Sequence, residues 1–366
     1  MASEWFATHA AGFGPLVIRL AARDVGGFAE PRSDDSSIRF SRGAEFDRSG
    51  PPIALLAYCR SLFRVLAETR GGLAEAARLF AADPSLEARI GGARSGRARF
   101  GEPGSGPSTF VLRGFGPDDP GSIPLESRRG IEGLIARATG MRPNSERPDR
   151  EYRLQERSDG RTLFLERVTS RAEALTRPGE LPRTTCRLLA EMTEPRPDDV
   201  VIDPFCGYGG IVLERVLAAP YRFAFASDTD AERIAELKRE LSAKAFEKRR
   251  KTFFPKVRDA LDSSAFESGF VTAIATDPPW GLFEGGMGGS EAERLFDSFM
   301  AEAERLLAPG GRLVLLVSRA LADRAFGDAS ARPASVRRSG GTFVLRESLD
   351  VLVSGKKARA LRLDRK

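Results

Sequence analysis

A short apolar run that breaks into a glycine-rich turn constrains the fold of this chain more than any other feature. Residues 200–202 are apolar and typical of a buried parallel strand, which ends at Asp203. The turn that follows contains Gly207, Gly209 and Gly210, and an amphipathic helix is predicted directly after it. A strand, a glycine turn and a helix in this order predict an open α/β sheet, in which ligands bind at the carboxyl ends of the strands.

The spacing of these glycines separates two kinds of ligand. Neither the Gly-x-x-x-x-Gly-Lys-Ser/Thr pattern nor the Gly-x-Gly-x-x-Gly pattern of phosphate-binding loops occurs in the turn. An acidic residue, Asp203, precedes the glycines instead. Because a carboxylate attracts positive charge, the turn suits a ligand with an ammonium and a sulfonium group better than one with phosphates. A glycine turn in some other α/β enzyme is the alternative.

A second motif, Asp277-Pro278-Pro279-Trp280, follows another apolar run that predicts a parallel strand. The motif is therefore expected at the same edge of the sheet as Asp203. There the Asp277 carboxylate and the Pro278 carbonyl would accept hydrogen bonds from an exocyclic amine and localise its lone pair for attack. Trp280 offers a flat face to a base, a contact of about 1–3 kcal/mol. A proline turn in which Trp280 only packs is the alternative.

Both motifs resemble those of one enzyme family. The turn Asp-Pro-Phe-Cys-Gly-x-Gly at 203–209 is similar to that of the class I S-adenosylmethionine-dependent RNA methyltransferases. The quartet at 277–280 is similar to the Asn/Asp-Pro-Pro-Tyr/Phe/Trp motif of methyltransferases that act on adenine N6, cytosine N4 or guanine N2. The resemblance runs from residue 178 to the end and implies S-adenosyl-L-methionine as the cofactor. Tyr208 and Gly210 depart from the usual turn, and Tyr208 is expected to crowd the cofactor pocket.

The resemblance implies a role for each polar residue at this edge. Asp228, which ends the predicted strand at 222–228, is expected to accept hydrogen bonds from both ribose hydroxyls, and Asp259 one from the adenine amino group. Asp230 is interpreted as the N-cap of the next helix. The predicted cofactor-binding residues are Asp203, Phe205, Gly207, Gly209, Asp228, Asp259 and Asp277. The predicted catalytic residues are Asp277, Pro278, Pro279 and Trp280.

The N-terminal half predicts a smaller α+β unit. A strand at 109–113, a helix at 125–139 and a β-hairpin at 152–166 follow one another. This order resembles the THUMP domain, an RNA-binding module of tRNA-modifying enzymes. The residues that carry the resemblance are Ser127-Arg128-Arg129, Arg147-Pro148-Asp149 and Asp159-Gly160. In a THUMP-like domain Arg128 and Arg129 are expected to contact RNA, whereas an unrelated α+β substrate domain is the alternative.

Four segments are predicted along the chain. Residues 1–70 are expected to form a ferredoxin-like region, 71–170 a THUMP-like domain, 171–182 a linker and 183–366 a Rossmann-like methyltransferase domain. Between residues 53 and 66, apolar side chains recur at helical spacing and predict a helix. The glycine-rich stretches 91–107 and 285–289 predict exposed loops, and the second is either a lid over the target base or a plain loop.

Composition limits the chemistry. A chain of 366 residues exceeds the usual size of one domain, and its net charge of +6 with a pI near 9.5 is compatible with a polyanionic partner. Three widely spaced cysteines and one histidine indicate neither a disulfide framework nor a zinc site, and no metal is expected. Because the sequence shows no signal peptide or apolar run long enough to span a bilayer, a cytoplasmic protein without membrane contact is expected.

The sequence predicts an RNA methyltransferase that acts on an exocyclic amine, and the resemblance to THUMP enzymes with this motif implies guanine N2 of tRNA as the leading substrate. A THUMP-like domain ahead of this catalytic motif favours tRNA as the partner, with ribosomal RNA as the alternative. A DNA adenine-N6 methyltransferase shares the quartet but would need a target-recognition domain. A non-catalytic RNA-binding protein is the alternative from another class. The chain is expected to act as a monomer.

Overall fold

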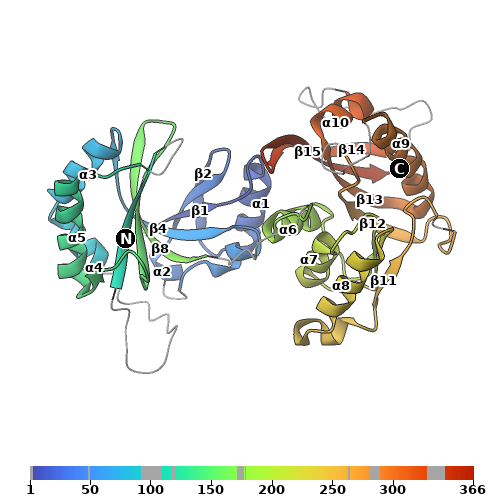
Figure 1. Cartoon of the computed structure of the whole chain (residues 1–366), viewed down its shortest axis with the longest axis horizontal. Helices are drawn as coiled ribbons and strands as arrows, with labels where there is room; N and C mark the ends of the chain where they lie inside the picture. Colours follow the sequence, from blue (N-terminus) through green and yellow to red (C-terminus); the bar gives the residue numbers. More distant parts are fainter. Residues whose placement is uncertain are drawn as a thin grey trace. The chain divides into compact units, whose positions relative to one another are not determined.

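The chain folds into two compact units, seen in the computed structural model of Figure 1. The first comprises Met1–His9 and Ile18–Ala172, and the second Ala10–Val17 and Glu173–Lys366. The structure describes residues 3–47, 50–91, 109–116, 121–170, 177, 179–262, 264–280, 289–327 and 343–366. The predicted loops at 92–107 and 285–288, and linker residues 171–176 and 178, lie outside the described residues.

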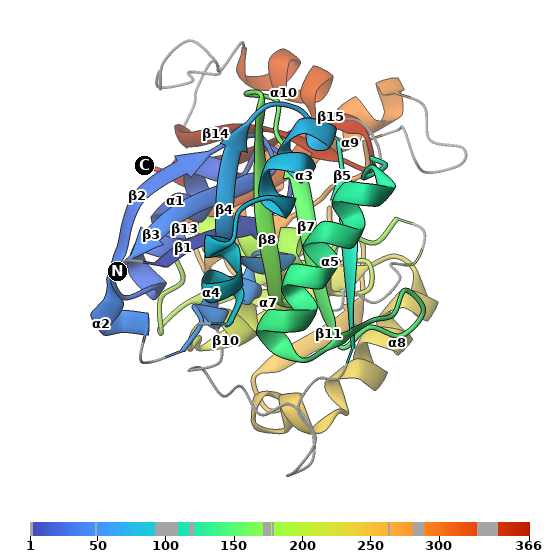
Figure 2. The same ribbon diagram turned by 90° about the vertical axis from the view of Figure 1, so that its left-hand side faces the viewer.

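One mixed sheet organises the first unit, with the strand order β2-β3-β1-β4-β8-β7-β5-β6. Its strands are β1 (Ser3–Thr8), β2 (Phe28–Ser33), β3 (Ser37–Arg42), β4 (Ser61–Arg70), β5 (Thr109–Phe115), β6 (Arg142–Pro143), β7 (Arg150–Glu156) and β8 (Arg161–Ser170). The helices are α1 (Gly14–Asp24), which crosses the division at residue 17, α2 (Ala44–Asp47), the 3-10 helix η1 (Ile53–Ala57), α3 (Leu73–Ala81), α4 (Ser85–Gly91) and α5 (Leu125–Thr139). Figure 2 shows α3, α4 and α5 over one face of this sheet.

The core of the first unit lies between that face and the three helices. Side chains of β5, β7 and β8 point into it at every second position, among them Leu112, Tyr152, Leu154 and Phe164. The boundary predicted at residue 70 falls at the end of β4, which pairs with β1 on one side and β8 on the other. The sheet is therefore continuous across the two segments that were predicted as separate domains.

The helix predicted between residues 53 and 66 is wrong. Residues 53–57 form the short η1, and residues 61–70 form β4 in the middle of the sheet. Leu66 and Ala67 belong to the core under the helices, whereas Phe63 and Val65 belong to a second cluster on the other face. A central strand with both faces covered is apolar almost continuously, so its spacing resembles that of a buried helix.

The second unit is a doubly wound α/β fold, as predicted for residues 183–366. Its sheet has the order β11-β10-β9-β12-β13-β15-β14, in which β11 to β13 are parallel and β14 and β15 form a closing antiparallel hairpin. The strands are β9 (Val200–Asp203), β10 (Phe223–Asp228), β11 (Phe253–Val257), β12 (Val271–Thr276), β13 (Leu307–Ser318), β14 (Phe343–Val353) and β15 (Lys356–Arg365).

Helices on both faces complete this unit. They are α6 (Arg183–Met192), α7 (Gly210–Ala218), α8 (Ala231–Leu241), the 3-10 helix η3 (Lys244–Arg249), α9 (Gly289–Leu306) and α10 (Arg319–Phe326). One core joins α7 and α8 to β10, and another joins α9 and α10 to β13. α8 ends at Leu241, and η3 begins at Lys244. Among the described residues, no helix is both long and apolar enough to cross a membrane.

A buried ionic cluster supports the edge of the second sheet opposite the glycine turn. Asp199, just before β9, accepts a hydrogen bond from Arg215 at 2.7 Å and another from Arg312. All three side chains are at most 2% exposed. Thr272 of β12 and the backbone of Arg196 also donate to Asp199, so its two oxygens are fully used.

Replacing Asp199 is expected to destabilise the second unit strongly. Asp199→Asn would leave two buried guanidinium groups without a counter-charge, which costs about 3–5 kcal/mol. Differential scanning calorimetry of the full chain measures the loss. Asp297→Asn is the matched control because Asp297 pairs with Arg324 at the surface, and it should cost less than about 1 kcal/mol. Equal losses in the two variants would contradict a structural role for the cluster.

Candidate functional site

Two neighbouring parallel strands bring the two sequence motifs together. β9 and β12 pair through Ile202 and Ile274, so both end at the same edge of the sheet. Asp203 ends β9, and Asp277 follows β12. The Thr276 hydroxyl donates a hydrogen bond of 2.7 Å to Asp203 Oδ1 and ties the two ends to each other. The prediction that the two motifs share one edge is confirmed.

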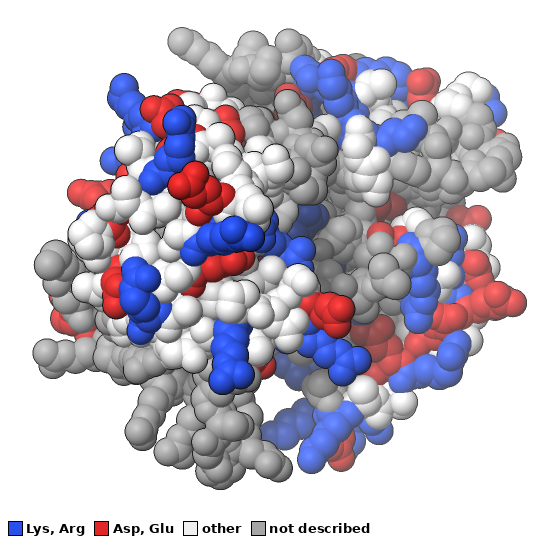
Figure 3. Space-filling model, turned by 60° about the vertical axis from the view of Figure 1, so that its left-hand side comes forward, with Lys and Arg blue, Asp and Glu red and all other residues white. Residues whose placement is uncertain are grey.

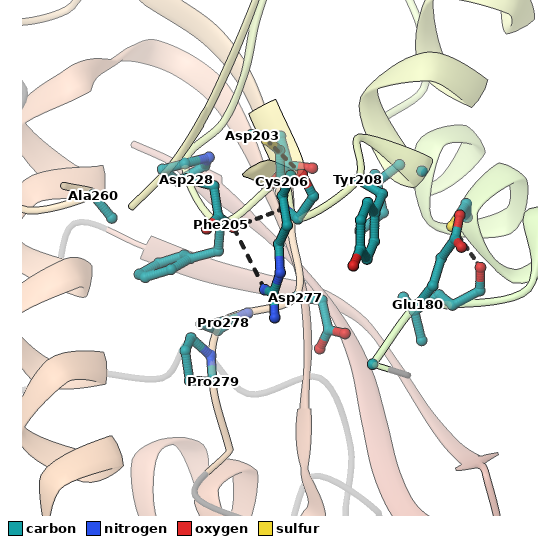
Figure 4. Close-up of a pocket in the computed structure, with 18 of the residues that line it drawn as sticks. Glu180, Asp203, Phe205, Cys206, Tyr208, Asp228, Ala260, Asp277, Pro278 and Pro279 are labelled. Atoms are coloured by element: carbon teal, nitrogen blue, oxygen red, sulfur yellow. Dashed lines mark hydrogen bonds and ion pairs between the residues drawn. The ribbon is translucent and has the colours of Figure 1, made fainter. Parts of the chain in front are cut away.

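A cavity of about 720 Å³ opens at this edge. The predicted residues that line it are Asp203, Phe205, Gly207, Asp228, Asp259, Asp277, Pro278, Pro279 and Trp280. Figure 4 shows the side chains of Asp203, Tyr208 and Asp277 around the same space. Gly209 is the one predicted cofactor residue outside this lining set.

The three glycines of the turn serve two different purposes. Gly207 has a φ of +53° and no atom near the place where a Cβ would stand, so its backbone faces open space. Gly209 has a φ of +86°, and a Cβ there would lie 2.4 Å from Leu237 of α8. A Cβ on Gly210 would lie 2.8 Å from the Cys186 sulfur of α6. Gly209 and Gly210 are therefore needed for packing, and Gly207 leaves room for a ligand.

Asp203 is a buried carboxylate with spare hydrogen-bonding capacity. Burial raises the pKa of Asp203 to about 7, an effect that the Thr276 hydroxyl and the backbone at Phe205 partly offset and that the charge of Asp228 increases. Its Oδ2 makes no well-formed hydrogen bond to any residue that the structure describes. An unsatisfied buried carboxylate oxygen that lines a cavity favours a cationic or hydrogen-donating ligand.

Asp228 holds the glycine turn in shape. One carboxylate oxygen accepts a hydrogen bond of 2.9 Å from the Gly207 amide, and the other accepts one of 2.9 Å from the Asp230 amide. Each carboxylate oxygen has a second lone pair, so Asp228 can still accept two donors from a ligand. Asp230 caps α8, as predicted, and accepts hydrogen bonds from the amides of Glu232 and Arg233. The predicted adenine acceptor, Asp259, is exposed and lines the same cavity.

The indole of Trp280 is buried against Asp277. Only 6% of Trp280 is exposed, and its Nε1 donates hydrogen bonds to Asp277 Oδ1 at 2.9 Å and to the Leu316 carbonyl at 3.2 Å. The sequence did not indicate the contact between Trp280 and Asp277. Whether an indole N–H reaches a carboxylate three residues away depends on the geometry of the turn between them. The stacking of Trp280 on a base stays a prediction.

Tyr208 lines the cavity, and two arginines lie close to its ring. The Arg177 guanidinium lies 4.5 Å from the Tyr208 ring centroid and that of Arg233 lies 5.7 Å from it. Arg177 also pairs with Glu236 of α8 at 2.7 Å. Glu180, from the predicted linker, joins the lining in Figure 4. The family resemblance implies that the Arg-Pro-Gly-Glu segment at 177–180 covers one side of the cofactor pocket, and Arg177 and Glu180 do line this cavity.

The predicted RNA-binding arginines belong to the first unit and are not part of this cavity. Both lie on α5. Arg128 donates a hydrogen bond to the Leu112 carbonyl at 3.1 Å and lies 3.6 Å from Glu132, whereas Arg129 is exposed. Their contact with RNA stays a prediction.

Residues 172–342 match the family of RMKL-like methyltransferase domains. A curated tRNA (guanine(10)-N2)-dimethyltransferase of Methanothermobacter thermautotrophicus is 30% identical over 139 residues, which are 38% of this chain and 38% of the relative. A tRNA (guanine(6)-N2)-methyltransferase of Thermus thermophilus is 30% identical over 236 residues, which are 60% of this chain and 65% of the relative. The matches thus span less than two thirds of these curated relatives.

Solved structures share the fold over the whole chain. TrmN from Thermus thermophilus superimposes with a TM-score of 0.70 at 22% identity and covers 100% of both chains. SMU.472, solved in complex with SAH, superimposes with a TM-score of 0.64 at 13% identity and covers 99% of this chain and 97% of the other. The second unit therefore has a Rossmann-like methyltransferase fold.

The buried carboxylate of Asp203 predicts an unusual pH dependence of stability. Its pKa is about 7 in the folded protein and has the ordinary value of 3.8 in the unfolded chain. Between these values the folded protein keeps a proton that the unfolded chain has lost, so the free energy of unfolding falls as pH rises toward 7. Asp203→Asn should remove this dependence and stabilise the ligand-free protein at pH 8 by on the order of 2–4 kcal/mol.

Urea unfolding of both proteins at several pH values between 5 and 8 measures the effect. Asp259→Asn is the control, since it removes an exposed carboxylate at the same edge and should change stability by less than about 0.5 kcal/mol. A destabilised Asp203→Asn protein at pH 8 would show that the carboxylate stabilises the fold.

Proposed function

Because residues 172–342 match the RMKL-like methyltransferase domain, we propose that this chain transfers a methyl group from S-adenosyl-L-methionine to guanine N2 of tRNA. The observation that carries the proposal is the hydrogen bond between Thr276 and Asp203. It holds the glycine turn and the Asp277 motif at one cavity, where a cofactor and an amine can meet.

The cavity suits the proposed cofactor in size, charge and backbone access. Its volume of about 720 Å³ lies within the range of cofactor pockets. The unsatisfied Oδ2 of Asp203 matches the ammonium of the methionine part, and Asp228 has lone pairs for the ribose hydroxyls. Asp259 is the acceptor for the adenine amine, and Gly207 allows close approach of the ligand to the backbone. The bound cofactor supplies a methyl group on a positively charged sulfur.

The Asp277 motif orients the amine. The Trp280 indole and the rigid Pro278-Pro279 pair hold the Asp277 carboxylate at the cavity edge. Asp277 and the Pro278 carbonyl accept the two amine hydrogens, so the nitrogen lone pair turns away from the aromatic ring and toward the cofactor side. Preorganised acceptors of this kind lower the barrier without moving during the reaction.

The substrate assignment depends on the relatives and on the first unit. Both curated relatives are named as tRNA guanine-N2 methyltransferases, at two different positions of tRNA. The THUMP-like first unit would select the RNA. In this proposal residues 1–70 form its ferredoxin-like part, 71–170 its THUMP-like part, and 171–182 link it to the second unit. We propose that the protein acts on tRNA as a monomer in the cytoplasm. Methylation of ribosomal RNA remains the second candidate, since the cavity has no feature that distinguishes the two RNAs.

Asp228→Ala should weaken S-adenosyl-L-methionine binding by about 1.5–3 kcal/mol, the usual value of charge-assisted hydrogen bonds. Isothermal titration calorimetry measures the affinity. Asp230→Ala is the control because Asp230 caps α8 and pairs with Arg233 at 3.3 Å but does not itself line the cavity. It should lower stability by about 1 kcal/mol and leave the affinity unchanged. Unchanged affinity in the Asp228 variant would remove this residue from the ribose site.

Asp277→Ala should slow single-turnover methylation of tRNA by at least about a hundredfold while the affinity for the cofactor stays within about threefold. Trp280→Phe separates the two roles of the tryptophan, since it keeps a ring but loses the N–H that contacts Asp277. If orientation of Asp277 matters, the Phe variant loses activity as the Ala variant of Trp280 does. Full activity of Asp277→Ala would rule out the amine mechanism.

A further inference from the structure

Three arginines lie together on the face of the first sheet that α3, α4 and α5 leave uncovered. Arg113 of β5 and Arg153 of β7 are register partners on adjacent parallel strands. Their neighbours Leu112 and Tyr152 point into the core under the helices, so both arginines point the other way. Arg167 of β8 lies on the same face, where it contacts Glu151.

The positive charge of this cluster is only partly balanced. Glu151 serves two of the arginines, since it accepts from Arg153 Nε and lies 3.0 Å from Arg167 Nη1. Arg113 has no ion-pair partner among the residues that the structure describes, and Arg167 Nε is buried without a hydrogen-bond partner there. Burial and the charges of Arg153 and Arg113 lower the pKa of Arg167, which Glu151 opposes.

Other arginines of the same sheet are paired more completely. Arg161 lies 2.8 Å from Glu68 and 3.4 Å from Asp159, and Arg39 contacts both Glu4 and Glu68. Like charges directly opposite each other destabilise a sheet, so three neighbouring arginines of which only two pair with Glu151 weaken the free protein. An anion from outside would relieve this repulsion.

Aromatic rings hold the guanidinium groups in place. The Arg153 guanidinium lies 4.9 Å from the ring centroid of Phe63 and 4.5 Å from that of Phe115. The Arg167 guanidinium lies 5.5 Å from Phe63. Stacking on a ring leaves the planar donor edge of an arginine available, so the cluster is preorganised for a phosphate.

We propose that Arg113, Arg153 and Arg167 form a binding site for the phosphate backbone of the substrate RNA. The inference rests on the proposed function for the identity of the anion. The proposed contact lies on the sheet face opposite α5. Arg128 lies on α5 itself and is already engaged by the Leu112 carbonyl and Glu132. On the face drawn in Figure 3, basic and acidic side chains are interspersed. The arginine cluster is marked instead by its local excess of positive charge.

Arg113→Gln is the decisive variant because Arg113 is exposed and has no ion-pair partner among the described residues, so the fold is expected to tolerate its loss. Binding of an unmodified tRNA transcript is measured by fluorescence anisotropy between about 50 and 200 mM salt. Arg113→Gln should weaken binding about threefold to tenfold and reduce the slope of log affinity against log salt by about one. Arg153→Gln should act similarly. Arg137→Gln is the control, since Arg137 pairs with Glu87 at 3.0 Å on the helical side, and should change the affinity less than twofold.

A second readout separates binding from structure. Removing Arg113 relieves repulsion, so the RNA-free variant should unfold at a temperature equal to or above that of the wild type while it binds RNA more weakly. The rate of methyl transfer at saturating tRNA should stay unchanged. Equal RNA affinity of the Arg113→Gln and Arg137→Gln proteins would overturn the site. A wild-type protein that binds tRNA through Arg113 but methylates no RNA would instead overturn the proposed function and leave the site standing.

Discussion

The hydrogen bond from Thr276 to Asp203 is the interaction on which the functional edge of this protein depends. It joins the last residue of β12 to the last residue of β9 at 2.7 Å, so the Asp277 motif and the glycine turn keep a fixed relation. From β9 the turn continues to Gly207, whose amide donates to Asp228 at the end of β10. Three parallel strands thus deliver three carboxyl-bearing positions to one cavity through backbone pairing and two short polar contacts.

The buried carboxyl of Asp203 lowers the stability of the ligand-free protein and favours ligand binding. Asp203 lies in a site that raises the pKa of its carboxyl to about 7, and one of its oxygens has no well-formed partner among the described residues. A positively charged ligand at this oxygen would stabilise the ionised carboxylate, which burial has deprived of water. Part of the stability that the ligand-free protein loses at Asp203 would therefore contribute to the binding affinity. The arginine cluster of the first unit follows the same physical rule with the opposite sign of charge.

Much of the second unit could be predicted from sequence because its signals are local. The run at 200–202, the three glycines and the Asp277 quartet each specify a strand end or a turn within a few residues. The contact between Trp280 and Asp277 could not be predicted, since it depends on how a proline turn directs one indole N–H. Arg177 and Arg233 reach Tyr208 from the linker and from α8, and no local pattern indicates that meeting.

The first unit shows the opposite limit. The hairpin and α5 were predicted because period-two and helical patterns are clear there. β4 was predicted as a helix because a strand covered on both faces loses its alternation. Arg113 lies opposite Arg153 because of the register between β5 and β7, two strands about 40 positions apart in sequence. Composition does not reveal this register.

Nucleoside mass spectrometry can show whether this chain methylates guanine N2 of tRNA. Unmodified tRNA transcripts are incubated with the full chain and isotopically labelled S-adenosyl-L-methionine, digested, and analysed for methylated nucleosides. We expect labelled N2-methylguanosine from the wild-type protein and its loss in the Asp277→Ala protein. A label on adenine N6, on a ring carbon or on no nucleoside at all would contradict this expectation.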